Sequence, residues 1–192
     1  MKRLQIAAAE LAFIALTLGA LVAHSAPTLP RDSIYQLDAA LTDQAGQAMR
    51  FSGLRGRPRV VTMFYTSCQY ICPLIVDSVK AIERGLTAQE RERVGFALIS
   101  MDPERDSPAA LKKVMDDRKL DPSRWALFRP AEADLRALAG VLGIRYRALS
   151  DGEFNHSTML VLVDAEGRVL ARTEKIGSDP EFLAAVHAAA AG

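Results

Sequence analysis

The sequence predicts a mixed α/β domain whose sheet is covered by helices on both faces. Short apolar segments rich in β-branched and aromatic residues recur along the chain, as in Arg59–Tyr65 and Val94–Ser100. Segments with apolar residues at helical spacing alternate with them, as in Glu132–Leu142. Hairpin signals stand near both ends of this alternating region, so we expect antiparallel strands beside the parallel ones.

The first part of the domain is predicted to contain a hairpin, a buried strand and a helix. Ser33–Leu37 and Ala48–Leu54 flank the turn sequence Asp43–Gly46, which indicates an N-terminal β-hairpin. Arg59–Tyr65 is expected to be a buried strand because it combines β-branched and aromatic residues. A helix is expected from about Cys72 to Arg84, with a proline near its first turn, where a missing N–H group costs little.

Capping signals, apolar periodicity and turn residues mark the elements that follow. Thr87–Glu90 forms a capping box, and Ser107 stands before a proline at the first helical position. Asp164–Gly167 indicates a second hairpin. The predicted elements are a short helix after Thr87, strands at Val94–Ser100 and Trp125–Phe128, helices from Ser107 to about Lys119 and over Glu132–Leu142, hairpin strands at Thr158–Val163 and Val169–Thr173, and a final helix over Pro180–Ala191.

The first 26 residues have the pattern of an export leader. Two positive residues, Lys2 and Arg3, precede the uncharged apolar run Leu11–Ala23, and small residues at its end offer cleavage sites. We therefore expect residues 1–26 to be a signal peptide or a membrane anchor and residues 27–192 to form one domain. That domain is expected to be exported and periplasmic, either soluble or tethered to the inner membrane, where thiols can be oxidised.

The balance of charge and the number of cysteines exclude several classes of protein. Twenty-four lysine and arginine residues face 23 aspartate and glutamate residues, so the formal net charge is +1. Proteins that bind a nucleic-acid phosphate backbone usually carry an excess of basic residues, and this chain has none, so we expect no nucleic-acid partner. Two cysteines are too few for a disulfide scaffold or a four-thiolate zinc site.

The two cysteines are spaced so that they can act together. Cys68 and Cys72 follow the predicted strand and stand at the start of the next helix, where four-residue spacing places two side chains on one face. The thiols can then form a disulfide or bind one metal ion, and the helix N-terminus favours the thiolate that both reactions need. The alternative is that the two cysteines are buried and have no chemical role, or that they form an inert disulfide.

A third ligand is predicted at His156, in a segment that leads into a strand of the same sheet. Two thiolates and one imidazole form a soft, low-coordinate set that suits copper(I) and can adapt to copper(II). Asp102 or Met101 could add a fourth ligand, which leaves zinc open. Asp102 has two further interpretations: a carboxylate that orients the histidine or docks a partner, or a residue that only shapes a turn.

Three sequence blocks together resemble the SCO/SenC family of copper-binding proteins, which has a thioredoxin-like fold. Phe64–Pro73 is similar to the family pattern F-x-Y-T-x-C-x-x-x-C-P, and Ile99–Pro108 is similar to I-S-V-D-P-x-R-D-T-P. Phe154–Ser157 matches the D-H-S block, with Asn155 in place of the aspartate. The similarity covers about residues 32 to 190, and it makes Cys68, Cys72 and His156 the expected copper ligands.

The resemblance implies a metallochaperone rather than an enzyme. Its members deliver copper, or provide thiol redox service, to the binuclear copper centre of cytochrome c oxidase, so the expected partner is a copper-accepting protein such as a subunit of that oxidase. Two alternatives stay open. The first is a periplasmic thiol–disulfide oxidoreductase that keeps the cysteines of a partner reduced, and the second is a copper or redox sensor that acts through protein contacts.

Overall fold

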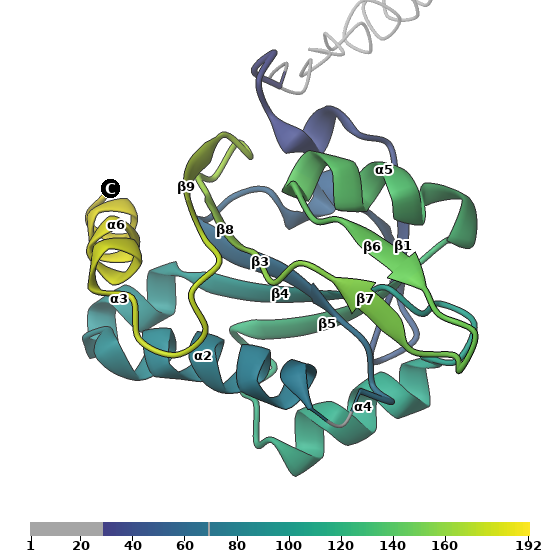
Figure 1. Cartoon of the computed structure of the whole chain (residues 1–192). Coiled ribbons are helices and arrows are strands. Elements are labelled where there is room, and N and C mark those ends of the chain that lie inside the picture. Colours follow the sequence, from purple (N-terminus) through teal and green to yellow (C-terminus); the bar gives the residue numbers. More distant parts are fainter. Residues whose placement is uncertain (1–28, 69) are drawn as a thin grey trace, which may run out of the picture.

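A seven-stranded mixed sheet forms the centre of the molecule (Figure 1), in a computed structural model that describes residues 29–68 and 70–192. The predicted leader lies outside the described residues. In spatial order the strands are β2 (Ala48–Arg50), β1 (Ala40–Asp43), β5 (Trp125–Pro130), β4 (Gly95–Ser100), β3 (Arg59–Phe64), β8 (Leu160–Val163) and β9 (Val169–Thr173). The three central strands β5, β4 and β3 are parallel, and the flanking strands are antiparallel to their neighbours. The predicted mixed sheet with an N-terminal hairpin is confirmed.

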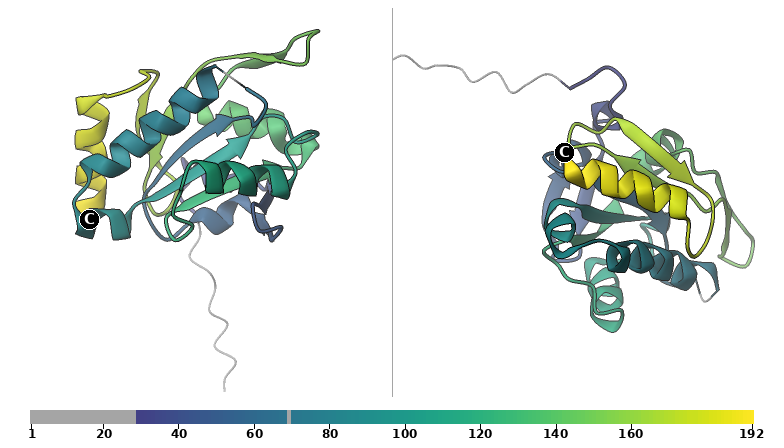
Figure 2. Two further views of the ribbon diagram at one scale, coloured as in Figure 1. Left: turned by 90° about the horizontal axis from the view of Figure 1, so that it is seen from below. Right: turned by 90° about the vertical axis from the view of Figure 1, so that its left-hand side faces the viewer.

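Helices cover both faces of this sheet, which explains why its central strands read as continuous apolar segments. α2 (Ile71–Gly85) and α4 (Pro108–Asp117) lie on one face, and α5 (Glu132–Leu142) lies on the opposite face (Figures 1 and 2). α3 (Ala88–Arg93) and α6 (Pro180–Ala191) pack against each other at the β9 edge. All six residues of β4 are buried between these layers.

Local capping groups begin two of the helices where the sequence predicts them. The Thr87 side chain accepts a hydrogen bond from the Glu90 N–H group, and the Glu90 carboxylate binds the Thr87 N–H group in return. Ser107 accepts a hydrogen bond from the Ala110 N–H group at the start of α4. Each cap satisfies amide groups that the first turn of a helix leaves without a partner.

The first predicted strand of the N-terminal hairpin, Ser33–Leu37, was wrong, and the second, Ala48–Leu54, was correct only at Ala48–Arg50. Ile34–Gln36 is a single turn of 3-10 helix rather than a strand, because the Ser33 hydroxyl caps the Tyr35 N–H group. Phe51–Leu54 is another such turn, and its Phe51 and Leu54 side chains are both buried. Hence the hairpin is shorter than predicted and consists of β1 and β2.

A second small sheet was not predicted and carries one of the expected ligands. β6 (Tyr146–Ala148) pairs antiparallel with β7 (Phe154–His156). The turn between them contains Gly152, whose φ of 83° is in the left-handed region that favours glycine. His156 is therefore the last residue of β7, in a sheet of its own, rather than part of a loop before β8.

The topology places the chemistry at the carboxyl ends of the parallel strands. β3 leads into the loop with Cys68, and β4 leads into the loop with Asp102. In sheets of this kind, ligands bind in the crevice outside these strand ends. Within residues 29–68 and 70–192, no helix has the length and apolar character that crossing a bilayer demands.

Candidate metal centre

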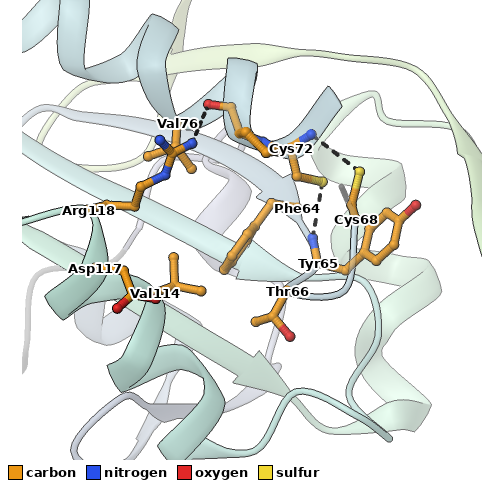
Figure 3. A pocket seen from close by; sticks show the side chains of 10 residues that line it. Phe64, Tyr65, Thr66, Cys68, Cys72, Val76, Val114, Asp117 and Arg118 are labelled. Atoms are coloured by element: carbon orange, nitrogen blue, oxygen red, sulfur yellow. Dashed lines mark hydrogen bonds between the residues drawn. The ribbon is translucent and has the colours of Figure 1, made fainter. Parts of the chain in front are cut away.

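The two cysteine sulfurs lie together at the start of α2, and both accept backbone hydrogen bonds (Figure 3). The Cys72 N–H group donates to the Cys68 sulfur at 3.3 Å, so that sulfur occupies the place of a helix cap. The Tyr65 N–H group donates to the Cys72 sulfur at 3.4 Å. Both thiols are free and buried. The pair lies at the start of the helix as predicted, but only Cys72 belongs to the helix, because α2 begins at Ile71 and Cys68 is in the loop before it.

The surroundings make the two thiols chemically different. Burial alone would raise the pKa of Cys68, but hydrogen bonds from the Cys72 and Tyr70 N–H groups help to lower it below its ordinary value. Burial raises the pKa of the Cys72 thiol, and the adjacent Cys68 sulfur raises it further. Cys68 is therefore the more acidic thiol of the pair, and Cys72 is the more enclosed partner that keeps its proton more readily.

A small cavity of about 120 Å³ gives access to the pair. Phe64, Val76 and Val114 form apolar parts of its wall, and both cysteines line it (Figure 3). The Arg118 guanidinium group closes one side and donates a hydrogen bond to the Pro73 carbonyl oxygen at 2.9 Å. Tyr70, the residue before α2, has 85% of its surface exposed.

His156 presents one ring nitrogen without a partner. Its Nδ1 atom lies 3.1 Å from the Ser157 carbonyl oxygen. Its Nε2 atom is buried, with no hydrogen bond to any of the described residues. When Nδ1 carries the proton and donates to the carbonyl, Nε2 has a free lone pair, which is the state that a metal-binding imidazole needs.

The structure brings the two thiols together but holds His156 apart from them. Tyr65 contacts both: its ring centroid is 5.9 Å from that of His156 in an edge-on contact, and its N–H group binds the Cys72 sulfur. Across the part of the chain that the structure describes, no three His, Cys, Asp or Glu side chains are close enough to bind one metal ion. A site with all three predicted ligands therefore requires movement of the His156 side chain, of β7 or of the cysteine loop.

The two aspartates after β4 make different contacts. Arg105 binds the carboxylate of Asp102, whereas the Nδ1 atom of His156 lies against the Ser157 carbonyl oxygen. Asp106 is fully buried and accepts hydrogen bonds from the hydroxyl groups of Ser100 and Thr66, both at 2.5 Å. Asp106 thereby fixes the loop that leads to the first cysteine.

Two residues near the site were missed as functional candidates. Tyr65 was assigned only to a strand, although a tyrosine next to a cysteine motif is a polar group at the end of an apolar segment. Asp106 lies four residues after Asp102 in the same loop and was not among the expected ligands. The sequence signal for Asp106 was an acidic residue in a loop next to apolar segments. A carboxylate that is buried in such a place needs hydrogen-bond donors, and these fix the loop around it.

Comparisons with known proteins agree with the fold. A Stutzerimonas stutzeri protein named for copper binding is 29% identical over 144 residues, which are 72% of this chain and 68% of the relative. The solved structure of Bradyrhizobium japonicum ScoI with copper bound has 26% identity and a TM-score of 0.67, over 80% of this chain and 98% of that one. A SCO1/SenC family lipoprotein from Bacillus anthracis has 23% identity and a TM-score of 0.71, over 85% and 99% of the two chains.

The similarity to one protein family extends over nearly the whole described domain. The family model for SCO1/SenC matches residues 31–191, which include both cysteines, the loop after β4 and the β6–β7 hairpin. The fold is the thioredoxin-like fold that the sequence blocks imply. On this evidence the chain belongs to the SCO1/SenC family.

Proposed function

We propose that this chain is an exported copper-binding protein. It delivers copper, or provides thiol redox service, to a protein copper site such as the binuclear centre of cytochrome c oxidase. One observation carries the proposal: Tyr65 contacts both the Cys68–Cys72 pair, through its N–H group, and the ring of His156, whose buried Nε2 atom lacks a partner. Family membership and the copper bound to the Bradyrhizobium relative support it.

The donor set favours copper over structural zinc. Zinc in structural sites takes four protein ligands, whereas copper(I) accepts two thiolates and one imidazole. Both residues considered as a fourth ligand are engaged elsewhere: Arg105 binds Asp102, and Met101 is fully buried in the core. Cys68, Cys72 and His156 would hold the ion as cargo. Transfer then proceeds as ligands of the recipient replace these three in turn.

The asymmetry of the thiols favours a second candidate, a thiol–disulfide oxidoreductase. A low-pKa Cys68 thiolate can attack a partner disulfide, forming a mixed disulfide and releasing one partner thiolate. Cys72 then attacks the Cys68 sulfur, which leaves a Cys68–Cys72 disulfide and a fully reduced partner. This reaction needs no histidine, so His156 distinguishes it from copper delivery.

Replacement of His156 by alanine tests the two candidates. Copper delivery requires the imidazole as a ligand, so His156→Ala should weaken copper affinity by at least about tenfold and leave disulfide exchange unchanged. His187→Ala is the matched control, because His187 binds Glu90 at 2.8 Å in the α3–α6 contact. Copper competition titrations and an exchange assay on both variants provide the measurement.

The opposite pattern would reject copper delivery. Unchanged copper affinity in His156→Ala, together with slower disulfide exchange, would make the oxidoreductase the better description. A redox-dependent, stable complex with another protein, without copper transfer, would favour a sensor instead.

Export is part of the proposal, and it can be tested independently of copper. Fusion of residues 1–28 to alkaline phosphatase, which becomes active only where disulfides form, should give an active enzyme. Replacement of Lys2 and Arg3 by glutamate should reduce that activity, because a positive region before the apolar run is a feature of export leaders. An inactive fusion would place the domain inside the cell.

A further inference from the structure

Tyr65 joins the cysteine loop to the β6–β7 hairpin. Its hydroxyl donates a hydrogen bond to the Glu153 carboxylate at 2.7 Å and accepts one from the Phe154 N–H group at 3.4 Å. Its backbone N–H group binds the Cys72 sulfur. The side chain is only 3% exposed. Tyr65 is therefore attached on one side to a thiol and on the other side to the hairpin that carries His156.

The Tyr65 ring packs against the hairpin that carries the histidine. The ring makes edge-on contacts with Phe154, at 5.1 Å between centroids, and with His156, at 5.9 Å. Because no three metal-binding side chains meet among the described residues, His156 must come closer to the thiols before it can share an ion with them, and a shift of β7 toward the cysteine loop brings it there. Glu153 directly precedes β7, so such a shift acts on its hydrogen bond to Tyr65.

The hairpin depends on such attachments for its position. Each of its strands has three residues, and an isolated two-stranded hairpin is only marginally stable in water. Arg105 binds the Gly152 carbonyl at the hairpin turn, and this contact is exposed to solvent. The Tyr65–Glu153 bond also involves one charged group, but it is partly buried, so water competes with it less than with the Arg105 contact.

We propose that the Tyr65–Glu153 hydrogen bond is a tether that holds the His156 strand apart from the thiols in the metal-free protein, and that its opening limits how fast copper is captured by all three ligands. Tyr65 acts as a positioning residue and Glu153 as its partner. The identity of the ion rests on the proposed function, whereas the tether is a property of the metal-free chain.

Copper capture by variants of the tether provides the first test. Copper(II) is mixed without oxygen with the full reduced chain, and the thiolate-to-copper absorption is followed in a stopped-flow instrument. Tyr65→Phe and Glu153→Ala should each capture copper about tenfold faster with unchanged final stoichiometry, as expected for loss of one charge-assisted hydrogen bond. Glu153→Ala is the cleaner variant, because it leaves the Tyr65 hydroxyl beside Cys68.

Two further variants separate the tether from general loosening of the hairpin. The double variant should be no faster than the faster single variant, because both changes remove the same bond. Tyr146→Phe is the matched control and should behave as the wild type. Tyr146 lies on β6, and its ring is 6.3 Å from that of Phe154, but its hydroxyl makes no hydrogen bond within the described part of the chain. Unchanged capture rates in both tether variants would overturn the proposal.

Hydrogen exchange of the metal-free protein tests the tether without copper. Amide groups in residues 146–156 should exchange faster in Glu153→Ala than in the wild type or in Tyr146→Phe. If amide exchange in Glu153→Ala equals that of the wild type, the tether is overturned, even where that variant captures copper faster. If amide exchange is faster in the variant but copper capture is not, the claim that the tether limits capture is overturned. If the wild type binds no copper, the proposed function fails, and faster exchange still upholds the tether.

Discussion

Cys68 and Cys72 are the same amino acid in two different environments. The Cys68 sulfur accepts an N–H group from the first turn of α2, and this stabilises its negative charge. Cys72 is the second residue of α2, and burial disfavours a charge on its thiol. The position of each sulfur relative to the helix start, rather than its side-chain type, thus decides which one reacts first.

Alkylation should reveal this difference directly. With iodoacetamide on the reduced protein, Cys68 should be modified first, since the thiolate is the reacting form. Because its pKa is lowered, its reaction should persist below pH 8.5, which is about the pKa of an unperturbed cysteine. Cys72 should react only at higher pH or after unfolding. Mass spectrometry of peptides from reactions between pH 6 and 9 gives both profiles.

A single-cysteine variant serves as the control for this experiment. In Cys68→Ser, the remaining Cys72 thiol should stay slow, because burial is the main reason for its raised pKa. Equal rates for the two thiols in the wild type, or faster reaction at Cys72, would contradict the assignment of Cys68 as the more acidic thiol.

At the scale of elements, one carboxylate ties α2 to the sheet. Glu83 on α2 accepts a hydrogen bond from the Arg124 guanidinium group at 2.9 Å and another from the Trp125 indole N–H group at 3.0 Å. Trp125 is buried and its ring stacks on Phe96 at 4.8 Å. The helix that presents the thiols is therefore fixed to the start of β5 through a group whose loss leaves a buried donor without a partner.

Replacement of Glu83 by alanine should consequently destabilise the domain. The expected loss is about 1–3 kcal/mol of unfolding free energy, the usual cost of an unsatisfied buried polar group. Asp116→Ala is the control, because Asp116 forms an exposed pair with Lys112 on α4 and should contribute little. Urea unfolding with equal m-values reports both changes. Equal midpoints for the two variants would show that Glu83 does not fix the helix.

Elements with local signals could be predicted from the sequence, and those that depend on distant contacts could not. The starts of α3 and α4 follow from capping residues within one turn, and the cysteine pair follows from its spacing. The β6–β7 hairpin has three-residue strands without apolar alternation, and distant contacts such as that between Phe154 and Tyr65 hold it in place. The function of Tyr65 was missed for the same reason, since Glu153 lies 88 residues further along the chain.

At the scale of the whole molecule, the first described residues and the two thiols lie at opposite ends of β3. The Ile34 N–H group binds the Gly167 carbonyl oxygen at 2.9 Å, and the Gly56 N–H group binds that of Ala165 at 2.9 Å. These contacts put the start of the described chain at the β8–β9 turn, beside the beginning of β3. The six residues of β3 then separate that end from the cysteine loop by about 20 Å.

Removal of residues 1–28 should accordingly leave copper binding unchanged in stoichiometry and affinity. The shortened protein retains both cysteines, His156, the Tyr65–Glu153 tether and all of residues 31–191 that match the family. The leader also contains a histidine, His24, so His24→Ala in the full chain is the matched variant. Competition titrations with a copper chelator compare the three proteins. Weaker copper binding in both altered proteins would show that His24 is a copper ligand and would contradict the assignment of His156. Weaker binding only after truncation would mean that residues 1–28 support copper binding through a group other than His24.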